Sequence, residues 1–434
     1  MSKTLWPAVA AAAIAALLLA NPQLWAQPPA DPPRVARLVR DLGADSFAVR
    51  TQASEELAKL GTAARREIEL ATRSDDPEVR LRAKDLLRAI KIYDLWSAGR
   101  FTCPDKPLPA TQLLRMVAEQ TGNHVLVGDQ FGTFQDSPVQ FDFAAADYWP
   151  TIDEVCRQTG NHCRAHYDSR MPGVVVVAGA PGRQPLAYAG PVRGRITSAR
   201  RAFNEELSYE DARSEKTHTF QLNLEMTWED RFKLVAYRSQ LEVLEACTDA
   251  GQVLTAAQPA SGGWNVAGSG TRQLTMNLRL NPPPASAREL DTLRLAWELM
   301  AVGDFVPLEV TDLSSHAPHF QDDVELIVDS FQPTTGSRYE LAVSIRRDLN
   351  LPEPQEVLFQ EHELDLLDAT GQPLRKLGQT GTLADHGALL KATFVAEGEN
   401  VTPKKLRFTY PRLRSQRELE VIFRHVPLPT GRPE

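Results

Sequence analysis

The chain of 434 residues is long enough for roughly three domains of about 150 residues each. Its hydrophobic content of 42% and charged content of 24% are ordinary for a soluble globular protein. It carries 48 Lys and Arg against 56 Asp and Glu, a formal net charge of −8. This mildly acidic balance, with no large basic block, argues against nucleic acid or an anionic lipid surface as a partner.

The N-terminal segment is typical of a secretory signal peptide. Lys3 supplies a positive charge, a continuous apolar run follows over residues 8–20, and Leu-Trp-Ala ending at Ala26 offers a cleavage site. The run is short for a hydrocarbon core of about 30 Å. We therefore expect residues 1–26 to be removed, which leaves a Pro-rich linker over residues 27–33 and a periplasmic or secreted chain without a transmembrane segment. Retention of the segment as an uncleaved anchor is the alternative.

Residues 34–100 predict helices in two similar halves. Apolar residues recur every three or four positions, and helix starts at Asp45 and Asp75 begin stretches that align at a spacing of about 30 residues. Gly61 is suited to end the helix between them. The pattern resembles a HEAT-like repeat of stacked helical hairpins. Two hairpins imply packing against the rest of the chain or, alternatively, one small docking face.

Residues 104–180 contain the pentapeptide Gln-Thr-Gly-Asn-His twice, ending at His124 and His162. The apolar pattern predicts the order helix, strand, strand, helix, strand, strand, and each pentapeptide lies where a helix stops at glycine and a strand begins. We interpret the repeat as this hinge. On a strand, His162 and His166 lie about 13 Å apart, too far for one zinc ion to bind both.

Five short stretches carry a resemblance to a known family: Leu113-Leu114, Val117-Ala118, Thr121-Gly122, Val125-Leu126-Val127 and Gln158-Thr159-Gly160. With them the region resembles the short N-terminal domain of secretins and TonB-dependent receptors, a small α/β domain of βαββαβ-like order. The resemblance implies a periplasmic protein-interaction module rather than a catalyst. Such a module would dock a partner through an exposed strand edge.

Two cysteines occupy positions that are apolar in the first copy of the repeat. Alignment of the copies places Cys156 opposite Ala118 and Cys163 opposite Val125, which suggests neighbouring core positions. In an oxidising compartment we expect a Cys156–Cys163 disulfide, worth a stabilisation near the lower end of about 2–4 kcal/mol. Two buried free thiols are the alternative.

The remainder of the chain predicts strands and turns. Short alternating segments separated by Asp and Gly turns indicate two antiparallel β-sandwich-like domains, over residues 190–313 and 320–427. A similar turn sequence, Asp-Ala-Gly-Gln from Asp249 and Asp-Ala-Thr-Gly-Gln from Asp368, occurs once in each. A single larger β domain is the alternative.

Candidates for chemistry are few. The sequence has no Gly-x-Ser-x-Gly, no His-Glu-x-x-His and no P-loop. One ligand-like cluster consists of His316, His319, Asp322 and Asp323, and we interpret it as an inter-domain linker, with a metal site as the alternative. No cofactor and no catalytic residue are predicted.

The sequence therefore predicts a multidomain α+β protein with a non-catalytic role. We expect an exported protein-interaction or scaffold module of a bacterial envelope, with an envelope protein as partner. One alternative is a carbohydrate-binding or carbohydrate-acting cell-surface protein, for which Trp264 in a Ser-Gly-Gly-Trp-Asn turn could stack on a sugar. The other is a metal-dependent hydrolase, which requires His316, His319, Asp322 and Asp323 to converge.

Overall fold

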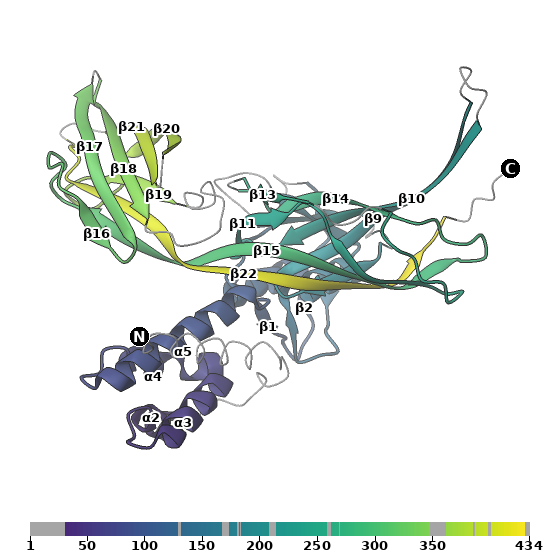
Figure 1. Cartoon of the computed structure of the whole chain (residues 1–434), viewed down its shortest axis with the longest axis horizontal. Coiled ribbons are helices and arrows are strands. Elements are labelled where there is room, and N and C mark those ends of the chain that lie inside the picture. The colour runs from purple at the N-terminus through teal and green to yellow at the C-terminus, as the bar shows by residue number, and fades with distance from the viewer. Residues whose placement is uncertain are drawn as a thin grey trace, which may run out of the picture. The chain divides into compact units, whose positions relative to one another are not determined.

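The computed structural model (Figure 1) describes residues 31–128, 132–166, 173–179, 182, 184–207, 214–257, 262–268, 270–334, 336–347, 362–384, 387–397 and 401–429. The predicted signal peptide lies outside the described residues. Helices and mostly antiparallel sheets confirm the mixed α+β class. The chain divides into two compact units, Met1–Ser97 and Ala98–Glu434. None of the described helices combines the length and apolar character needed to cross a membrane.

The first unit is helical and internally repeated. Its elements are α2 (Pro32–Asp41), α3 (Phe47–Leu60), the 3-10 turn η2 (Gly61–Ala64), α4 (Arg65–Ala71) and α5 (Pro77–Trp96). The Asp76 carboxylate caps α5 by accepting the N–H group of Glu78 at 2.8 Å. Arg50 donates to the carbonyl oxygen of Ala44 at 2.7 Å, and Arg80 donates in the same way to Ser74 at 2.5 Å. Arg50 and Arg80, which occupy equivalent positions in the two halves of the predicted repeat, therefore make the same contact with the backbone six residues earlier.

A small α/β domain begins the second unit. Its elements are β1 (Arg100–Thr102), β2 (Leu108–Pro109), α6 (Ala110–Thr121), β3 (Val125–Leu126), β4 (Pro138–Val139), β5 (Ala145–Asp147), α7 (Tyr148–Thr159), β6 (Asn161–His166) and β7 (Gly173–Ala178). The strand order β3-β7-β6 forms the main sheet, with β3 parallel to β7. Strand β4 is short, and just beyond it Phe141 and Phe143 pack together at 5.1 Å between ring centroids.

Each copy of Gln-Thr-Gly-Asn-His ends a helix. Gly122 and Gly160 adopt left-handed φ angles of 70° and 69°, which glycine reaches without a steric penalty. The preceding threonine hydroxyl donates to the carbonyl oxygen four residues earlier, at 2.7 Å for Thr121 and 2.8 Å for Thr159. The interpretation of the repeat as a helix-to-strand hinge is confirmed.

Antiparallel sheets that are compatible with two β-sandwich-like domains make up the rest of the unit, and we call these two halves the first and the second sandwich. The first has β8 (Leu186–Ala189), β9 (Val192–Leu207), β10 (Ser214–Trp228), β11 (Lys233–Arg238), β12 (Glu242–Thr248), β13 (Trp264–Val266), β14 (Gln273–Leu280) and β15 (Glu289–Val310). The second has β16 (His319–Gln321), β17 (Val324–Thr334), β18 (Arg338–Arg347), β19 (Glu363–Leu367), β20 (Arg375–Ala384), β21 (Gly387–Val395) and β22 (Lys405–Pro427). The order β14-β10-β9-β8 corresponds to β21-β18-β17-β16, with β20 added beside β21.

Matching turns support an internal duplication of the sandwich. After β12 the N–H group of Leu254 donates to Ala246 at 2.7 Å, and after β19 that of Leu374 donates to Leu366 at 2.8 Å. The repeated Asp-Ala turn thus has the same backbone pairing in both copies. The hairpin between β8 and β9 turns at Gly190 with a φ of 54°, and that between β16 and β17 turns at Asp322 with a φ of 53°.

The last strands of the two sandwiches pair with each other along their whole length. The β15–β22 ladder runs antiparallel from Glu289–Pro427 to Val310–Leu406 without a register shift. Strands β15 and β22 therefore each contribute to both of the predicted β domains, whose boundary between residues 313 and 320 stays a prediction.

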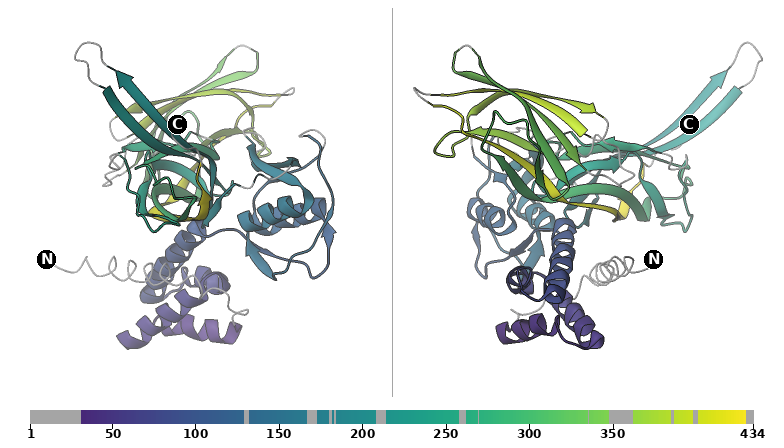
Figure 2. Two further views of the ribbon diagram at one scale, coloured as in Figure 1. Left: turned by 90° about the vertical axis from the view of Figure 1, so that its right-hand side faces the viewer. Right: turned by 60° about the vertical axis from the view of Figure 1, so that its left-hand side comes forward.

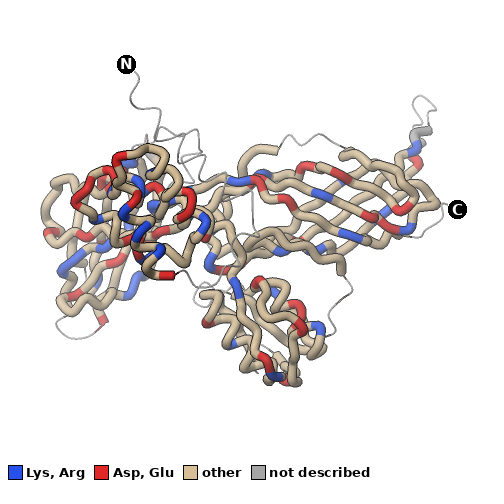
Figure 3. The backbone as a smooth tube through the Cα atoms, turned by 90° about the horizontal axis from the view of Figure 1, so that it is seen from below, with Lys and Arg blue, Asp and Glu red and all other residues tan. Residues whose placement is uncertain are grey.

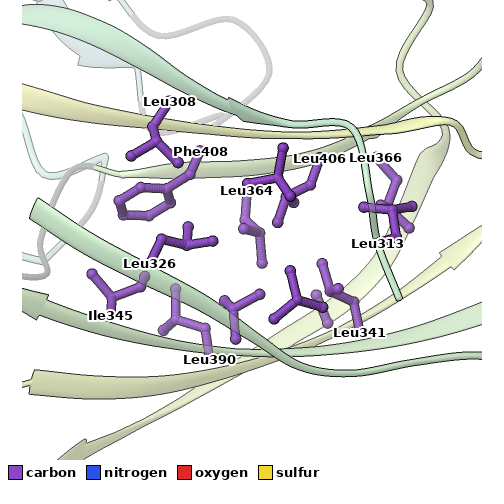
Figure 4. Packing of buried hydrophobic residues seen from close by; sticks show 14 of the residues in the cluster. Leu308, Leu313, Leu326, Leu341, Ile345, Leu364, Leu366, Leu390, Leu406 and Phe408 are labelled. Carbon is purple, nitrogen blue, oxygen red and sulfur yellow. The ribbon is translucent and has the colours of Figure 1, made fainter. Parts of the chain in front are cut away.

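The core of the second sandwich shows this sharing of strands (Figure 4). Leu308 of β15 lies with Leu364 of β19 and Phe408 of β22 on one side, and Leu326, Ile345 and Leu390 of the facing sheet lie on the other. All six side chains are buried. In the first sandwich, Phe423 of β22 lies beside Gly194 of β9. A Cβ atom at Gly194 would come within 2.8 Å of the Phe423 ring, so the two sheets meet closely there.

Phe423→Ala should destabilise the first sandwich by about 3–5 kcal/mol, because it leaves a cavity opposite β9. Hydrogen exchange by mass spectrometry should show faster exchange in β9 and β10 than in the wild type. Ile422→Ala is the matched control, since the neighbouring side chain is exposed on the opposite face of the same strand. Faster exchange confined to β17 and β18 would contradict the shared-strand arrangement.

Candidate functional site

Buried polar groups gather where the α/β domain meets the first sandwich. The fully buried Glu229 carboxylate, just after β10, accepts hydrogen bonds from the Gly99 N–H group at 2.9 Å, the Asn123 amide at 2.8 Å and Arg231 Nε at 2.6 Å. Burial raises the pKa of Glu229, while Arg231 and Asn123 oppose that shift. Three donors on one carboxylate make Glu229 the polar centre of this joint.

The two copies of the pentapeptide use their asparagines differently. In the first copy Asn123 bonds to Glu229, and Asp230 accepts the His124 backbone N–H group at 3.1 Å and contacts the His124 ring. In the second copy Asn161 stays within its own domain and pairs with both backbone groups of Gln135, at 3.0 and 2.9 Å. The first copy therefore fastens the domain to the sandwich, a role that the sequence did not indicate.

A pocket of about 540 Å³ lies at the same joint, between α7 and β6 on one side and β8 and β9 on the other. Cys156 and Cys163 both line it, and the Cys156 thiol donates a hydrogen bond to the Cys163 sulfur. Both are free thiols in the structure. Both residues belong to one buried cluster, as the alignment of the repeat predicted, and a disulfide between them stays a prediction.

Arg193 of β9 connects this thiol pair to the first sandwich. Its side chain is 5% exposed, and its Nη1 donates to the Cys163 sulfur at 2.7 Å and lies 3.4 Å from the Asp153 carboxylate. The guanidinium also stands over the Trp149 ring, 5.1 Å from its centre. Among the residues that the structure describes, its Nε has no hydrogen-bond partner. An incompletely paired buried cation is costly, so this arginine marks a candidate site.

The surroundings polarise the two thiols in opposite directions. The hydrogen bond from Cys156 and the charge of Arg193 lower the pKa of Cys163, against the effect of burial. The same hydrogen bond and burial raise the pKa of Cys156. Tyr188 completes the group by donating its hydroxyl to Asp153 at 2.8 Å. Cys163 is therefore the thiol prepared to carry negative charge.

The structure does not assemble the histidine and aspartate cluster into a metal site. His316 Nδ1 lies 2.8 Å from the carbonyl oxygen of Val328, and His319 belongs to β16. Asp322 accepts the Tyr410 hydroxyl at 3.1 Å.

Asp323 is bound by Arg347 at 3.0 Å. Asp322 and Asp323 form the β16–β17 turn, equivalent to Gly190-Pro191 in the first sandwich, which explains their composition without a metal.

Among the described residues, one group brings three potential ligand atoms within 4.8 Å of one another: Glu289, Asp291 and His425. His425 Nδ1 lies 3.1 Å from Glu289 and 3.8 Å from Asp291. Glu289 and His425 are 136 residues apart in the sequence, so only the β15–β22 ladder reveals their proximity. The side chains are largely solvent-exposed, and we interpret them as a surface ion-pair cluster.

Trp264, the candidate for carbohydrate stacking, lies in strand β13. The Arg238 guanidinium stands 4.9 Å from the centre of its ring, and the residue packs against the buried cluster that contains Val235 and Met300. A ring engaged in this way offers little free face to a sugar.

No protein-family model, no curated protein and no solved structure matches the chain. The candidate site is therefore argued from its own geometry.

Asn123→Ala and Asn161→Ala should separate the two roles of the repeated motif. Each removes hydrogen bonds from a buried site and should lower the free energy of unfolding by about 1–3 kcal/mol. Hydrogen exchange should increase around Gly99 in Asn123→Ala and around Gln135 in Asn161→Ala. The same exchange pattern in both variants would contradict the assignment of the joint to the first copy.

Glu229→Gln should change how stability depends on pH. The raised pKa of Glu229 means that the folded protein holds this proton more tightly than the unfolded chain, whose value is near 4.5. The contribution of Glu229 to the free energy of unfolding is therefore fully present below pH 4.5 and is lost as the pH rises through the raised pKa. Glu229→Gln should not show this loss of stability. Urea unfolding across that range measures it.

The matched control is Glu298→Gln. A hydrogen bond from Arg238 lowers the pKa of Glu298, so its contribution to stability is present above its ordinary value of 4.5 and is lost as the pH falls through the lowered one. The two variants should change the pH profile in opposite directions. Equal profiles would show that Glu229 is not the group responsible.

Proposed function

We propose that the chain is a non-catalytic, exported interaction protein of a bacterial envelope, in which the outer part of the β9–β10 hairpin meets a partner protein. The observation that carries the proposal is a two-stranded ribbon, residues 202–207 of β9 and 214–219 of β10, that pairs only with itself among the described residues. Figure 2 shows these strands running out beyond the rest of their sheet.

The ribbon has the features of a docking element. A two-stranded ribbon is marginally stable alone, and its outer edges carry backbone groups that a partner strand can pair with. Phe203 is 40% exposed and lies edge-on to His218 at 4.5 Å between ring centroids. An exposed aromatic side chain on such a ribbon is a suitable anchor for a protein partner.

The rest of the second unit supports a binding role over a catalytic one. The polar groups at the joint largely bond to one another and hold the α/β domain to the first sandwich through Glu229, Asp230 and Arg193. We assign that domain the role of a fixed support, which refines the expectation from its resemblance to secretin and TonB-receptor domains. In the view of Figure 3, acidic and basic positions are interspersed along the described strands of both sandwiches, a pattern that gives no support to a nucleic-acid partner.

A shortened chain tests the proposal. Replacing residues 202–219 with Asn-Gly joins Arg201 to Phe220, which are paired in the ladder, through a two-residue hairpin turn. We expect the wild-type mature chain to capture one protein from the envelope fraction of its own cells, and binding of that purified protein to fall at least about tenfold in the shortened chain.

Point variants provide the control for this deletion. Phe203→Ser should weaken binding, whereas Phe305→Ser should not, although both side chains are 40% exposed phenylalanines on β-strands. Undiminished binding by the shortened chain would move the docking surface elsewhere. Capture of cell-wall glycan instead of protein would favour the carbohydrate-binding alternative.

A further inference from the structure

We propose that Cys156 and Cys163 form a reactive dithiol site that takes low-molecular-weight disulfides through the pocket at the joint and closes to an intramolecular disulfide. The inference rests on the geometry of the pocket and does not depend on the proposed function. It assigns a chemistry to the thiol pair and a role to the incompletely paired Arg193.

Cys163 is placed as the attacking thiol. Arg193 Nη1 lies 2.7 Å from its sulfur, and the Cys156 thiol donates a hydrogen bond to the same atom. Both contacts favour the thiolate, which is the nucleophilic form in disulfide exchange. The Cys163 thiol also donates to Asp153 Oδ1 at 3.7 Å, and the charge of Asp153 opposes the effect of Arg193. The charge on Cys163 therefore depends on the balance between Arg193 and Asp153.

Cys156 is placed as the resolving thiol. It belongs to the same buried cluster as Cys163 and lines the same pocket, and its raised pKa keeps it protonated until Cys163 has reacted. Once the Cys163 sulfur has entered a mixed disulfide, it no longer accepts the hydrogen bond from Cys156 or carries charge. The hydrogen bond and the charge of Cys163, which raise the pKa of Cys156, are then lost. Cys156 can therefore ionise and attack the Cys163 sulfur.

The exchange balances without a metal or a cofactor. Cys163 attacks one sulfur of the small disulfide, a mixed disulfide forms and the first small thiol leaves. Cys156 then attacks the Cys163 sulfur, the intramolecular disulfide forms and the second small thiol leaves. Two protein thiols lose two electrons and two protons, and the small disulfide becomes two thiols.

The pocket gives the site its access and its substrate class. Its volume of about 540 Å³ is within the range of pockets that hold small molecules. Besides the two cysteines, the lining includes Arg157, His162 and Glu154, so both charge signs are present. Arg157 and Glu154 are bound to each other at 2.5 Å, and a small disulfide that carries both amino and carboxylate groups, such as glutathione disulfide, could exchange partners with this pair.

Closure of the disulfide also changes the joint. Cys163 ceases to be a charged partner of Arg193, whose Nε already lacks a hydrogen bond, and Asp153 at 3.4 Å remains as its counter-ion. We therefore expect the root of β9 to be held less tightly by the α/β domain in the oxidised form. Hydrogen exchange over residues 186–196 should be faster after oxidation than before.

The test uses the fully reduced, full-length chain incubated with glutathione disulfide at neutral pH. Peptide mass spectrometry after alkylation should show Cys156 and Cys163 joined, while Cys103, whose pKa is raised by burial, remains alkylatable only after unfolding. Arg193→Gln should slow the reaction at least about tenfold, because the neutral amide removes the positive charge that lies 2.7 Å from the Cys163 sulfur. Arg193→Lys should restore part of the rate.

Single-cysteine variants test the order of attack. Cys156→Ser should trap Cys163 as a stable mixed disulfide with glutathione, whereas Cys163→Ser should leave Cys156 unmodified. Asp153→Asn should accelerate the reaction, opposite to Arg193→Gln, so a general loss of folding cannot explain both results. The proposal is overturned if Cys156 is the residue trapped, if both thiols stay reduced while Cys247 reacts, or if Arg193→Gln reacts as fast as the wild type.

Discussion

The β15–β22 ladder is the constraint on which the second unit depends. Each strand begins in its own sandwich and ends in the other, and the pairing keeps one register from Glu289–Pro427 to Val310–Leu406. A slip of one residue would move the core side chains of both halves to the solvent side at once, because side chains alternate along a strand. The two sandwiches have matching strand orders and are linked through this one ladder, so they are related as the two subunits of a symmetric dimer would be. Asp304 has a left-handed φ of 54° and interrupts the regular pairing. Arg412 lies opposite and donates from Nε to the Asp304 carboxylate at 3.0 Å, which links the two strands at this point.

A second constraint, the polar joint, depends on the first. The α/β domain lies against β8 and β9, whose sheet faces β22 across the first sandwich. Glu229 and Arg193 are buried charges, which are tolerated only when their partners are held in place. Gly99, Asn123 and Cys163 supply those partners from the α/β domain. The buried charges of Glu229 and Arg193 therefore depend on a backbone N–H group, an amide side chain and a thiol that the neighbouring domain holds in place.

The sequence was most informative where the cause of structure is local. Gly122 and Gly160 end helices by their own conformational freedom, and Asp76 caps α5 by a contact within its own turn. Alternation located most strands, because one face of each is buried. Repetition within the sequence also placed Cys156 beside Cys163.

Contacts between segments that are distant in the sequence could not be predicted from local sequence patterns. Asn123 and Glu229 are 106 residues apart, and nothing in the local pattern distinguishes Asn123 from Asn161, which bonds within its own domain. The cluster of His316, His319, Asp322 and Asp323, interpreted as an inter-domain linker, could not be placed from the sequence for a related reason. Asp322 and Asp323 are the turn of a hairpin, and that role became visible only when β16 and β17 could be matched to β8 and β9.

The matched hairpins also show how two copies of one fold have acquired different surfaces. The ladder positions of Tyr188 and Arg193 in the first sandwich correspond to Phe320 and Glu325 in the second. Tyr188 and Arg193 reach Asp153 of the α/β domain, whereas Phe320 is 71% exposed and Glu325 faces Arg346 at 3.8 Å. The outer face of the first sheet therefore bonds to the α/β domain through residues that the second copy lacks. Because the cores are equivalent and these side chains are not, the specific chemistry of the chain is concentrated on the first copy, at the thiol pocket and at the root of the ribbon.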